Sequence, residues 1–316
     1  MAKPEMCVKV INSSFSEDFH LLAFFGQQNV SYFLIFSILL MYFLCMLGNL
    51  IIIAVVWTAP RLHTPMYFLL CNLSALDITY ASTILPKFLD YQITGRNSIP
   101  STNCFTQLFM YITCVDTEFL LLSSMAYDRY VAICNPLKYS IIMNKNSCII
   151  LSLTPWTIGL LNSLLFVFLI SHLSFCNSKN IIHFYCDMKA ILRASCSDTR
   201  HVNLVILSEG YTLGFLAFGM ILTSYAFIIS AILKIKTSSK RLKIFSSCSS
   251  HLTVVVLFCG SSLSVYMNPE SKNSTEQDLM LSMLYVAVVP ALNPLVYSLR
   301  NKDVLDVLRI PKFISG

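Results

Sequence analysis

The fold is decided by the stretch YFLIFSILLMYFLCMLGNLIIIAVV at residues 32–56, which holds 25 residues without a charge. A membrane-spanning helix needs about 20 consecutive apolar residues. Two further apolar stretches are interrupted only by acids: residues 62–86 contain Asp77, and residues 104–127 contain Asp116 and Glu118. Four more charge-free runs bring the number of predicted spans to seven. These spans are predicted to be helices, because the runs are too long for tilted membrane strands. These four are residues 146–178, 210–233, 244–269 and 279–299.

The composition excludes an ordinary soluble domain. The 316 residues are 56% hydrophobic and only 12% charged, where a soluble domain has about 25% charged residues. With the N-terminus outside, the inner loops and tail hold 13 Lys/Arg against 3 Asp/Glu, whereas the outer segments hold 9 against 10. This bias marks the inner face of the membrane. The net charge of +6 therefore reflects topology rather than nucleic-acid binding.

The predicted fold is an all-α membrane protein, a seven-transmembrane helix bundle with an extracellular N-terminus and a short C-terminal amphipathic helix. Its parts are an outer tail at residues 1–31, the bundle at residues 32–299, and a cytoplasmic amphipathic helix and tail at residues 300–316. Asn12 heads the sequon that we favour for glycosylation, ahead of Asn29 and Asn273. Four of the twelve cysteines lie at the outer side, and an oxidising exterior allows three pairings among them. They are Cys104, Cys176, Cys186 and Cys196.

The most specific motif is MAYDRYVAICNPLKY at residues 125–139, at the inner end of the third span. Other motifs are GN at 48–49, LHTPMYFLLCNLSALD at 62–77, KIFSSCSSHL at 243–252 and PALNPLVYSLRNKDV at 290–304. The long outer loop adds HFYCD at 183–187 and SCSDT at 195–199. Over nearly the whole chain this pattern resembles the olfactory (odorant) receptor family of rhodopsin-like G-protein-coupled receptors.

The resemblance implies a G-protein switch at the inner end of the bundle. In receptors of this class Asp128 pairs with Arg129 in the inactive state, and activation frees the arginine to meet the G protein. A bare arginine in a span is costly, so an ion pair is the expected resting arrangement. Tyr130 completes the tripeptide, and Tyr225 and Tyr297 occupy positions where the family stabilises the open state. The alternative is that this cluster only caps the bundle.

Asp77 and Glu118 are intramembrane acids, which the resemblance places in one central cluster with Asn49 and Asn293. Two adjacent carboxylates do not both ionise cheaply, so the pair shares a proton or binds a cation. In related receptors this site holds sodium. The alternative is a neutral, hydrogen-bonded pair that packs the helices together. We expect no other cofactor. We also expect no metal at His183 and Cys186, because the resemblance implies a disulfide for Cys186, and a disulfide-bonded cysteine does not bind metal as a thiolate.

The resemblance also implies disulfides between Cys104 and Cys186 and between Cys176 and Cys196. It places a small volatile ligand in the outer half of the bundle, where mostly apolar walls suit such a molecule. The chain departs from the family at Cys259, where an aromatic is usual, and at Asp116, where a small neutral residue is commoner. The expected lining is Tyr111, Ile112, Val115, Asp116, Glu209, Cys259, Ser262, Leu263 and Tyr266.

Asp116 and Glu118 lie two positions apart, or about 200° around a helix, so Asp116 is expected to point away from the central cluster and toward the fifth span. Glu209, 16 residues before Tyr225, is expected at the same cavity. One hypothesis is that both acids select a ligand bearing a cation or a hydrogen-bond donor. The other is that Asp116 is protonated and bonded to a neighbouring helix, with Glu209 at the wet membrane rim.

The resulting functional prediction is an odorant receptor that activates a heterotrimeric G protein of the stimulatory olfactory type and raises cyclic AMP. We expect a multi-pass protein of the plasma membrane, in the cilia of olfactory sensory neurons. A transporter or channel would show matching polar positions in two halves or broken helices, and neither is visible. No catalytic motif suggests a membrane enzyme. A related receptor used outside the nose stays open, because expression site is not encoded in these motifs.

Overall fold

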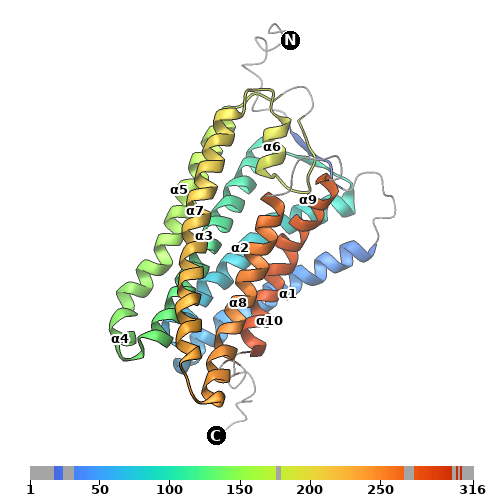
Figure 1. The fold of residues 1–316 in the computed structure, drawn as a ribbon. Helices are drawn as coiled ribbons and strands as arrows, with labels where there is room; N and C mark the ends of the chain where they lie inside the picture. The colour runs from blue at the N-terminus through green and yellow to red at the C-terminus, as the bar shows by residue number, and fades with distance from the viewer. Residues whose placement is uncertain are drawn as a thin grey trace.

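The computed structural model describes residues 18–23, 32–175, 179–266 and 274–300, together with Val304 and Val307. Long helices lie side by side along one direction, with a short helix, α6, at one end and another, α4, at the opposite end (Figure 1). The long helices are α1 (Tyr32–Thr58), α2 (Pro65–Thr94), α3 (Ser101–Cys134), α5 (Lys145–Ser171), α7 (Arg200–Leu233) and α8 (Ser238–Tyr266). The shorter helices are η2 (Pro60–Leu62), η3 (Pro136–Lys138), α4 (Tyr139–Ile142) and α6 (Met188–Ala194).

The last apolar segment is an interrupted helix. It runs through α9 (Ser274–Met283), a π-helical stretch named η4 (Leu284–Val288) and α10 (Val289–Arg300). Within the described part of the chain, six helices are long and apolar enough to cross a membrane, and α8 contains a shorter apolar stretch at Cys248–Gly260. The chain is thus a multi-pass membrane protein. Most of the expected C-terminal helix lies outside the described residues, of which Val304 and Val307 are helical.

Helix α3 is the centre of the bundle. It packs against α2, α5, α7 and α8. In its most apolar stretch of 18 residues 72% of the residues are buried, against 22% in the corresponding stretch of α1. Large apolar side chains on α1, α5 and α7 are exposed, as expected of helices that face lipid. Gly48 on α1 lets this helix approach α10, because an added Cβ atom would lie 2.7 Å from Cγ of Pro294.

Several helices differ in extent from the charge-free runs that predicted them, most clearly α7 and α5. Helix α7 begins at Arg200, ten residues before its run, and α5 ends at Ser171, seven residues before the end of its run. Charge-free runs mark the part that suits hydrocarbon, whereas backbone hydrogen bonding continues a helix into polar sequence. Helix α2 ends at Thr94, and the next residue, Gly95, has a left-handed φ of 73°, which glycine adopts more easily than other residues at a helix C-terminus.

A small sheet at the α6 end was not predicted. Its three strands are β1 (Phe19–Leu21), β2 (Ser98–Ile99) and β3 (Asn180–Ile181). Strand β1 lies in the middle, antiparallel to β2 and parallel to β3. Strands of two or three residues are too short for the alternating pattern that identifies a strand in a sequence.

Candidate functional site

The end of α3 next to α4, which is the expected inner end, carries a buried carboxylate with two partners. Oδ2 of Asp128 lies 3.5 Å from Nε of Arg129, and the side chain of Asp128 is fully buried. The hydroxyl of Tyr139 on α4 donates to Oδ1 of Asp128 at 2.8 Å. Burial, followed by the nearby carboxylate, raises the pKa of Tyr139, so this hydroxyl stays a donor. The inner loop is therefore tied directly to the ion pair.

A second inner contact joins α7 to α8. The hydroxyl of Tyr225 lies 2.7 Å from Nδ1 of His251, and the two rings are stacked. Nε2 of His251 lies 3.1 Å from the carbonyl oxygen of Leu122 on α3. His251 thus connects three helices in a fully buried position. Tyr130 contacts Phe227 on α7, with ring centroids 5.6 Å apart.

The central polar residues are all buried. Nδ2 of Asn293 donates to both carboxylate oxygens of Asp77, at 3.1 and 3.0 Å. Asn49 bonds instead to the carbonyl oxygens of Cys45 and Pro290. Among the described residues, Oε1 of Glu118, Oδ1 of Asn293 and Oγ of Ser74 are buried oxygen atoms without a hydrogen-bond partner.

The half of the bundle nearest α6, which is the expected outer half, contains a layer of aromatic rings. Tyr111 stacks on Tyr80 at 5.9 Å and contacts Tyr185 of the outer loop at 5.0 Å. Four of the expected lining residues are buried here: Tyr111, Ile112, Val115 and Cys259. Ser262, Leu263 and Tyr266 lie on α8, outside the residues whose side chains the structure describes.

Asp116 and Glu209 are brought to the same place by a third residue. Nδ2 of Asn162 on α5 donates to Oδ2 of Asp116 at 2.6 Å and to Oε1 of Glu209 at 2.8 Å. Asn162 is buried, and both acids are half-buried. One amide group therefore bridges two carboxyl groups from α3 and α7.

A lid of loop residues covers this half of the bundle. Cys186 forms a disulfide with Cys104, the pair that the family resemblance implies. Cys196 is also disulfide-bonded, while Cys176, its expected partner, lies outside the described residues, as does Asn12. Burial lowers the pKa of His183 in this lid, while Asp187 and Asp278 act in the opposite direction. Hydrogen bonds from Arg200 lower the pKa of the exposed Asp198 to about 2.

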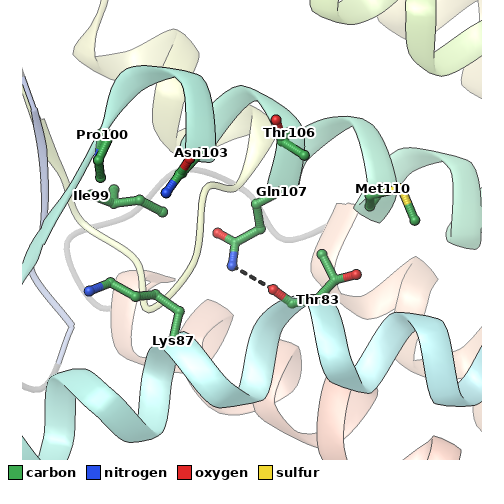
Figure 2. Close-up of a pocket in the computed structure, with 8 residues that line it drawn as sticks. All are labelled: Thr83, Lys87, Ile99, Pro100, Asn103, Thr106, Gln107 and Met110. Carbon is green, nitrogen blue, oxygen red and sulfur yellow. Dashed lines mark hydrogen bonds between the residues drawn. The ribbon is translucent and has the colours of Figure 1, made fainter. Parts of the chain in front are cut away.

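A groove of about 370 Å³ lies between the outer ends of α2 and α3, and Figure 2 shows its lining. Gln107 braces it, because its Nε2 donates to the carbonyl oxygen of Thr83 at 2.9 Å and its Oε1 accepts from the backbone N–H of Cys186 at 2.9 Å. None of the expected ligand-lining residues lines this groove. It is separate from the expected odorant pocket.

Asn162, His251 and Tyr139 are the candidate functional residues that sequence reasoning missed. Each had a signal: Asn162 is a polar residue in an apolar run, His251 lies in KIFSSCSSHL, and Tyr139 ends the motif at residues 125–139. Their bonding partners lie far away in the sequence or on another helix, and the sequence alone does not show that proximity. In the part of the chain described, no three His, Cys, Asp or Glu residues are grouped as they would be to hold a metal ion.

Comparison with known proteins gives this arrangement a family. The sequence profile described as "Olfactory receptor" matches residues 38–313. The chain is 41% identical to olfactory receptor 1f45 of Rattus norvegicus over 94% of its length and 95% of the relative's. It is also 41% identical to human olfactory receptor 13F1, over 92% and 91%, and 44% identical to rat olfactory receptor 1468, over 89% of each chain. The chain therefore belongs to the olfactory receptor family of G-protein-coupled receptors, and it is not an enzyme.

Proposed function

We propose that this receptor binds a small volatile odorant in the outer half of a seven-span bundle and activates a stimulatory heterotrimeric G protein, raising cyclic AMP. The N-terminus faces outward, and the protein works in the plasma membrane of sensory cilia. The observation that carries the proposal is the inner cluster in which Asp128 contacts both Arg129 and Tyr139. A permanent cation held in a largely buried ion pair is costly, and an ionisable residue retained in a membrane span despite that cost is a candidate functional residue.

In this proposal the inner cluster is the resting state of a switch. Tyr139 and Asp128 hold Arg129, while His251 ties Tyr225 on α7 to Leu122 on α3. Outward movement of the inner part of α8 breaks the contacts of His251 and releases Tyr225. Arg129 then turns from Asp128 toward the G protein, and Tyr225 and Tyr297 stabilise the open form.

We further propose that a sodium ion stabilises the resting state beside Asp77 and Glu118. The fit is supported by the unpartnered oxygens of Glu118, Asn293 and Ser74, since hard cations prefer carboxylate, amide and hydroxyl oxygens. Bound there, the ion would supply positive charge to two carboxylates in a low-dielectric interior. Asn293 would keep the carboxylate of Asp77 oriented through its two hydrogen bonds.

For the odorant itself, we propose a molecule with a protonated amine or a strong hydrogen-bond donor. Asp116 and Glu209 both accept hydrogen bonds from the side-chain NH2 group of Asn162, and this neutral group brings no charge to balance two carboxylates. A cationic group placed between them would supply that charge, and charge-assisted hydrogen bonds are about twice as strong as neutral ones.

The test compares the parent with Asp116→Asn in cells that report cyclic AMP, using matched series of amines and alcohols. Loss of a charge-assisted bond worth about 1.5–3 kcal/mol predicts a roughly 10- to 150-fold loss of amine potency, with neutral agonists much less affected. Thr113→Ser is the control on the same helix, because it keeps the hydroxyl that bonds Ser163. Equal shifts for amines and alcohols would reject the ligand class, and ligand-driven flux without cyclic AMP would reject the receptor function.

A further inference from the structure

The segment before α1 is built into the lid. The backbone N–H of Leu21 donates to the carbonyl oxygen of Asn97 beside β2 at 2.9 Å. On the other side, toward β3, the backbone N–H of His20 donates to the carbonyl oxygen of Lys179 at 2.9 Å. The backbone N–H of Leu22 donates to the carbonyl oxygen of Ile181 at 2.8 Å. Strand β1 therefore lies between two outer loops and is hydrogen-bonded to both of them.

Side chains of β1 are buried as deeply as any in the bundle. Phe19 is 1% exposed, and Leu21 and Ala23 are fully buried, whereas His20 between them is exposed. The ring of Phe19 packs edge-on against Phe175 of the outer loop at 5.2 Å. The hydroxyl of Tyr91 at the outer end of α2 donates to the carbonyl oxygen of Ala23 at 3.1 Å. Removing β1 would therefore uncover the ring of Phe175 and leave the hydroxyl of Tyr91 without the carbonyl oxygen of Ala23.

The lid continues from β3 to the expected ligand site within a few residues. Ile181 in β3 and Phe184 after it are fully buried, and Phe184 contacts Phe88 on α2 at 5.0 Å. Tyr185 then lies against Tyr111, with ring centroids 5.0 Å apart. The segment is fixed at its far end by the disulfide of Cys186. Strand β1 supplies the second fixed point, at β3.

We propose that Phe19 and Leu21 are positioning residues for ligand binding: by holding β3 between β1 and the disulfide, they keep Tyr185 against Tyr111 over the pocket. This inference rests on the proposed odorant site for its functional consequence. Changes in β1 then alter agonist potency and the ranking of agonists, while the response at saturating agonist is kept, since the inner switch is at the other end of the bundle.

The first experiment compares Leu21→Ala with His20→Ala, its exposed neighbour on the same strand. Leu21→Ala removes buried contacts, for which the usual cost is large, and we expect an EC50 at least about tenfold higher with an unchanged maximum. His20→Ala leaves the EC50 as in the parent. Surface receptor is measured by antibody on intact cells, so that a folding loss is separated from a loss of potency. Equal EC50 values for parent and Leu21→Ala overturn the proposal.

A double-mutant cycle then tests the route through Tyr185. If β1 acts by placing Tyr185, the EC50 of Leu21→Ala with Tyr185→Ala is close to that of Tyr185→Ala alone. A double variant whose shift is the product of the two single shifts shows independent action and overturns the proposed route.

A cross-link covers the case in which Leu21→Ala reaches the surface poorly. His20 pairs with Ser98, and the hydrogen bond from Leu21 to Asn97 makes this a non-hydrogen-bonded antiparallel pair, whose Cα atoms lie about 4.5 Å apart. That spacing suits a disulfide. We expect His20→Cys with Ser98→Cys to cross-link spontaneously and to restore the EC50 of Leu21→Ala, whereas either single cysteine does neither. A cross-link without restored potency, or no cross-link, overturns the proposal. A parent receptor that responds to no agonist in the panel counts against the proposed function, and is distinguishable because the cross-link needs no ligand.

Discussion

Gly159 on α5 allows the closest approach between this helix and α3. A Cβ atom added there would lie 2.6 Å from Oγ1 of Thr117 and 2.8 Å from the carbonyl oxygen of Thr113. Small residues commonly permit such close packing between membrane helices. The hydroxyl of Thr117 has some freedom to turn, but the carbonyl oxygen of Thr113 belongs to the backbone of α3 and moves only with the helix. Gly159→Ala must therefore push the two helices apart.

The change in stability expected for Gly159→Ala follows from two opposing effects. Alanine is better than glycine inside a helix by about 1 kcal/mol, whereas an extra methyl group in a packed interface costs about 1–3 kcal/mol. Gly214→Ala on α7 isolates the first effect, because an added Cβ atom meets nothing within 4 Å there. We expect Gly159→Ala to be less stable than Gly214→Ala by about 1–3 kcal/mol, the overpacking cost alone.

The assay is thermal unfolding of the receptor in detergent, with surface level in cells as a second readout. Thr117→Ala combined with Gly159→Ala should recover part of the loss, because it removes the 2.6 Å contact but not the 2.8 Å contact with the backbone. If Gly159→Ala melts at or above the temperature of Gly214→Ala, α3 and α5 are not packed as closely as described, and the reasoning fails.

Three further predictions concern other contacts. Tyr139→Phe removes a hydrogen bond to a carboxylate worth about 1.5–3 kcal/mol and should raise basal cyclic AMP per surface receptor, an effect that Tyr127→Phe should not reproduce. Asn293→Leu leaves Asp77 without its two amide contacts and should lower stability by about 1–3 kcal/mol, which unfolding in detergent measures; a gain in stability would contradict it. Because burial lowers the pKa of His183, the folded lid favours the neutral ring, and stability should be lost as the pH falls below the unfolded value of about 6.5. The EC50 should then rise by at most about tenfold per pH unit, a dependence that His183→Phe should weaken.

Much of the helical architecture follows from the sequence, because charge-free runs of 21 to 33 residues leave few alternatives in a membrane. The ends of the helices are predicted less well from the sequence. Helix α7 starts ten residues early, at Arg200, since Asp198 and Thr199 begin a turn that hydrophobicity does not mark. Strand β1 is invisible for another reason: its three residues form a strand only because two distant loops meet beside them.

The candidate sites divide in the same way. The polar residues at the inner end form motifs that the sequence displays directly, and the pairing of Asp128 with Arg129 is between adjacent residues. The contact of Tyr225 with His251 joins two helices and is not visible in the sequence. The sites in the middle and outer bundle depend on contacts between distant positions, such as Asn162 with Glu209, 47 residues apart. Helical periodicity predicted that Asp116 points away from Glu118 and toward the fifth span, which is α7. The side chain of Asp116 instead accepts a hydrogen bond from Asn162 on α5, the fourth span, and meets Glu209 of α7 only through that amide. Periodicity gives a direction, but not the residue that occupies it.

That difference explains why the residues proposed for ligand specificity are harder to recognise in the sequence than the residues proposed for signalling. The proposed inner switch meets a G protein, and its ion pair lies in a short stretch of α3 next to the loop after it. The proposed outer pocket draws on α3, α5, α7 and α8, and the loop segment over it is held by β1 and by the disulfide of Cys186. Cysteine in place of an aromatic residue at position 259 changes one wall of the proposed pocket. A substitution of Asn162 would instead alter the surroundings of two acids at once, because its amide bridges Asp116 and Glu209. Ligand choice should therefore respond more strongly to residues that connect separate segments of the chain, such as Asn162 and Leu21, than to most residues that only line the proposed cavity.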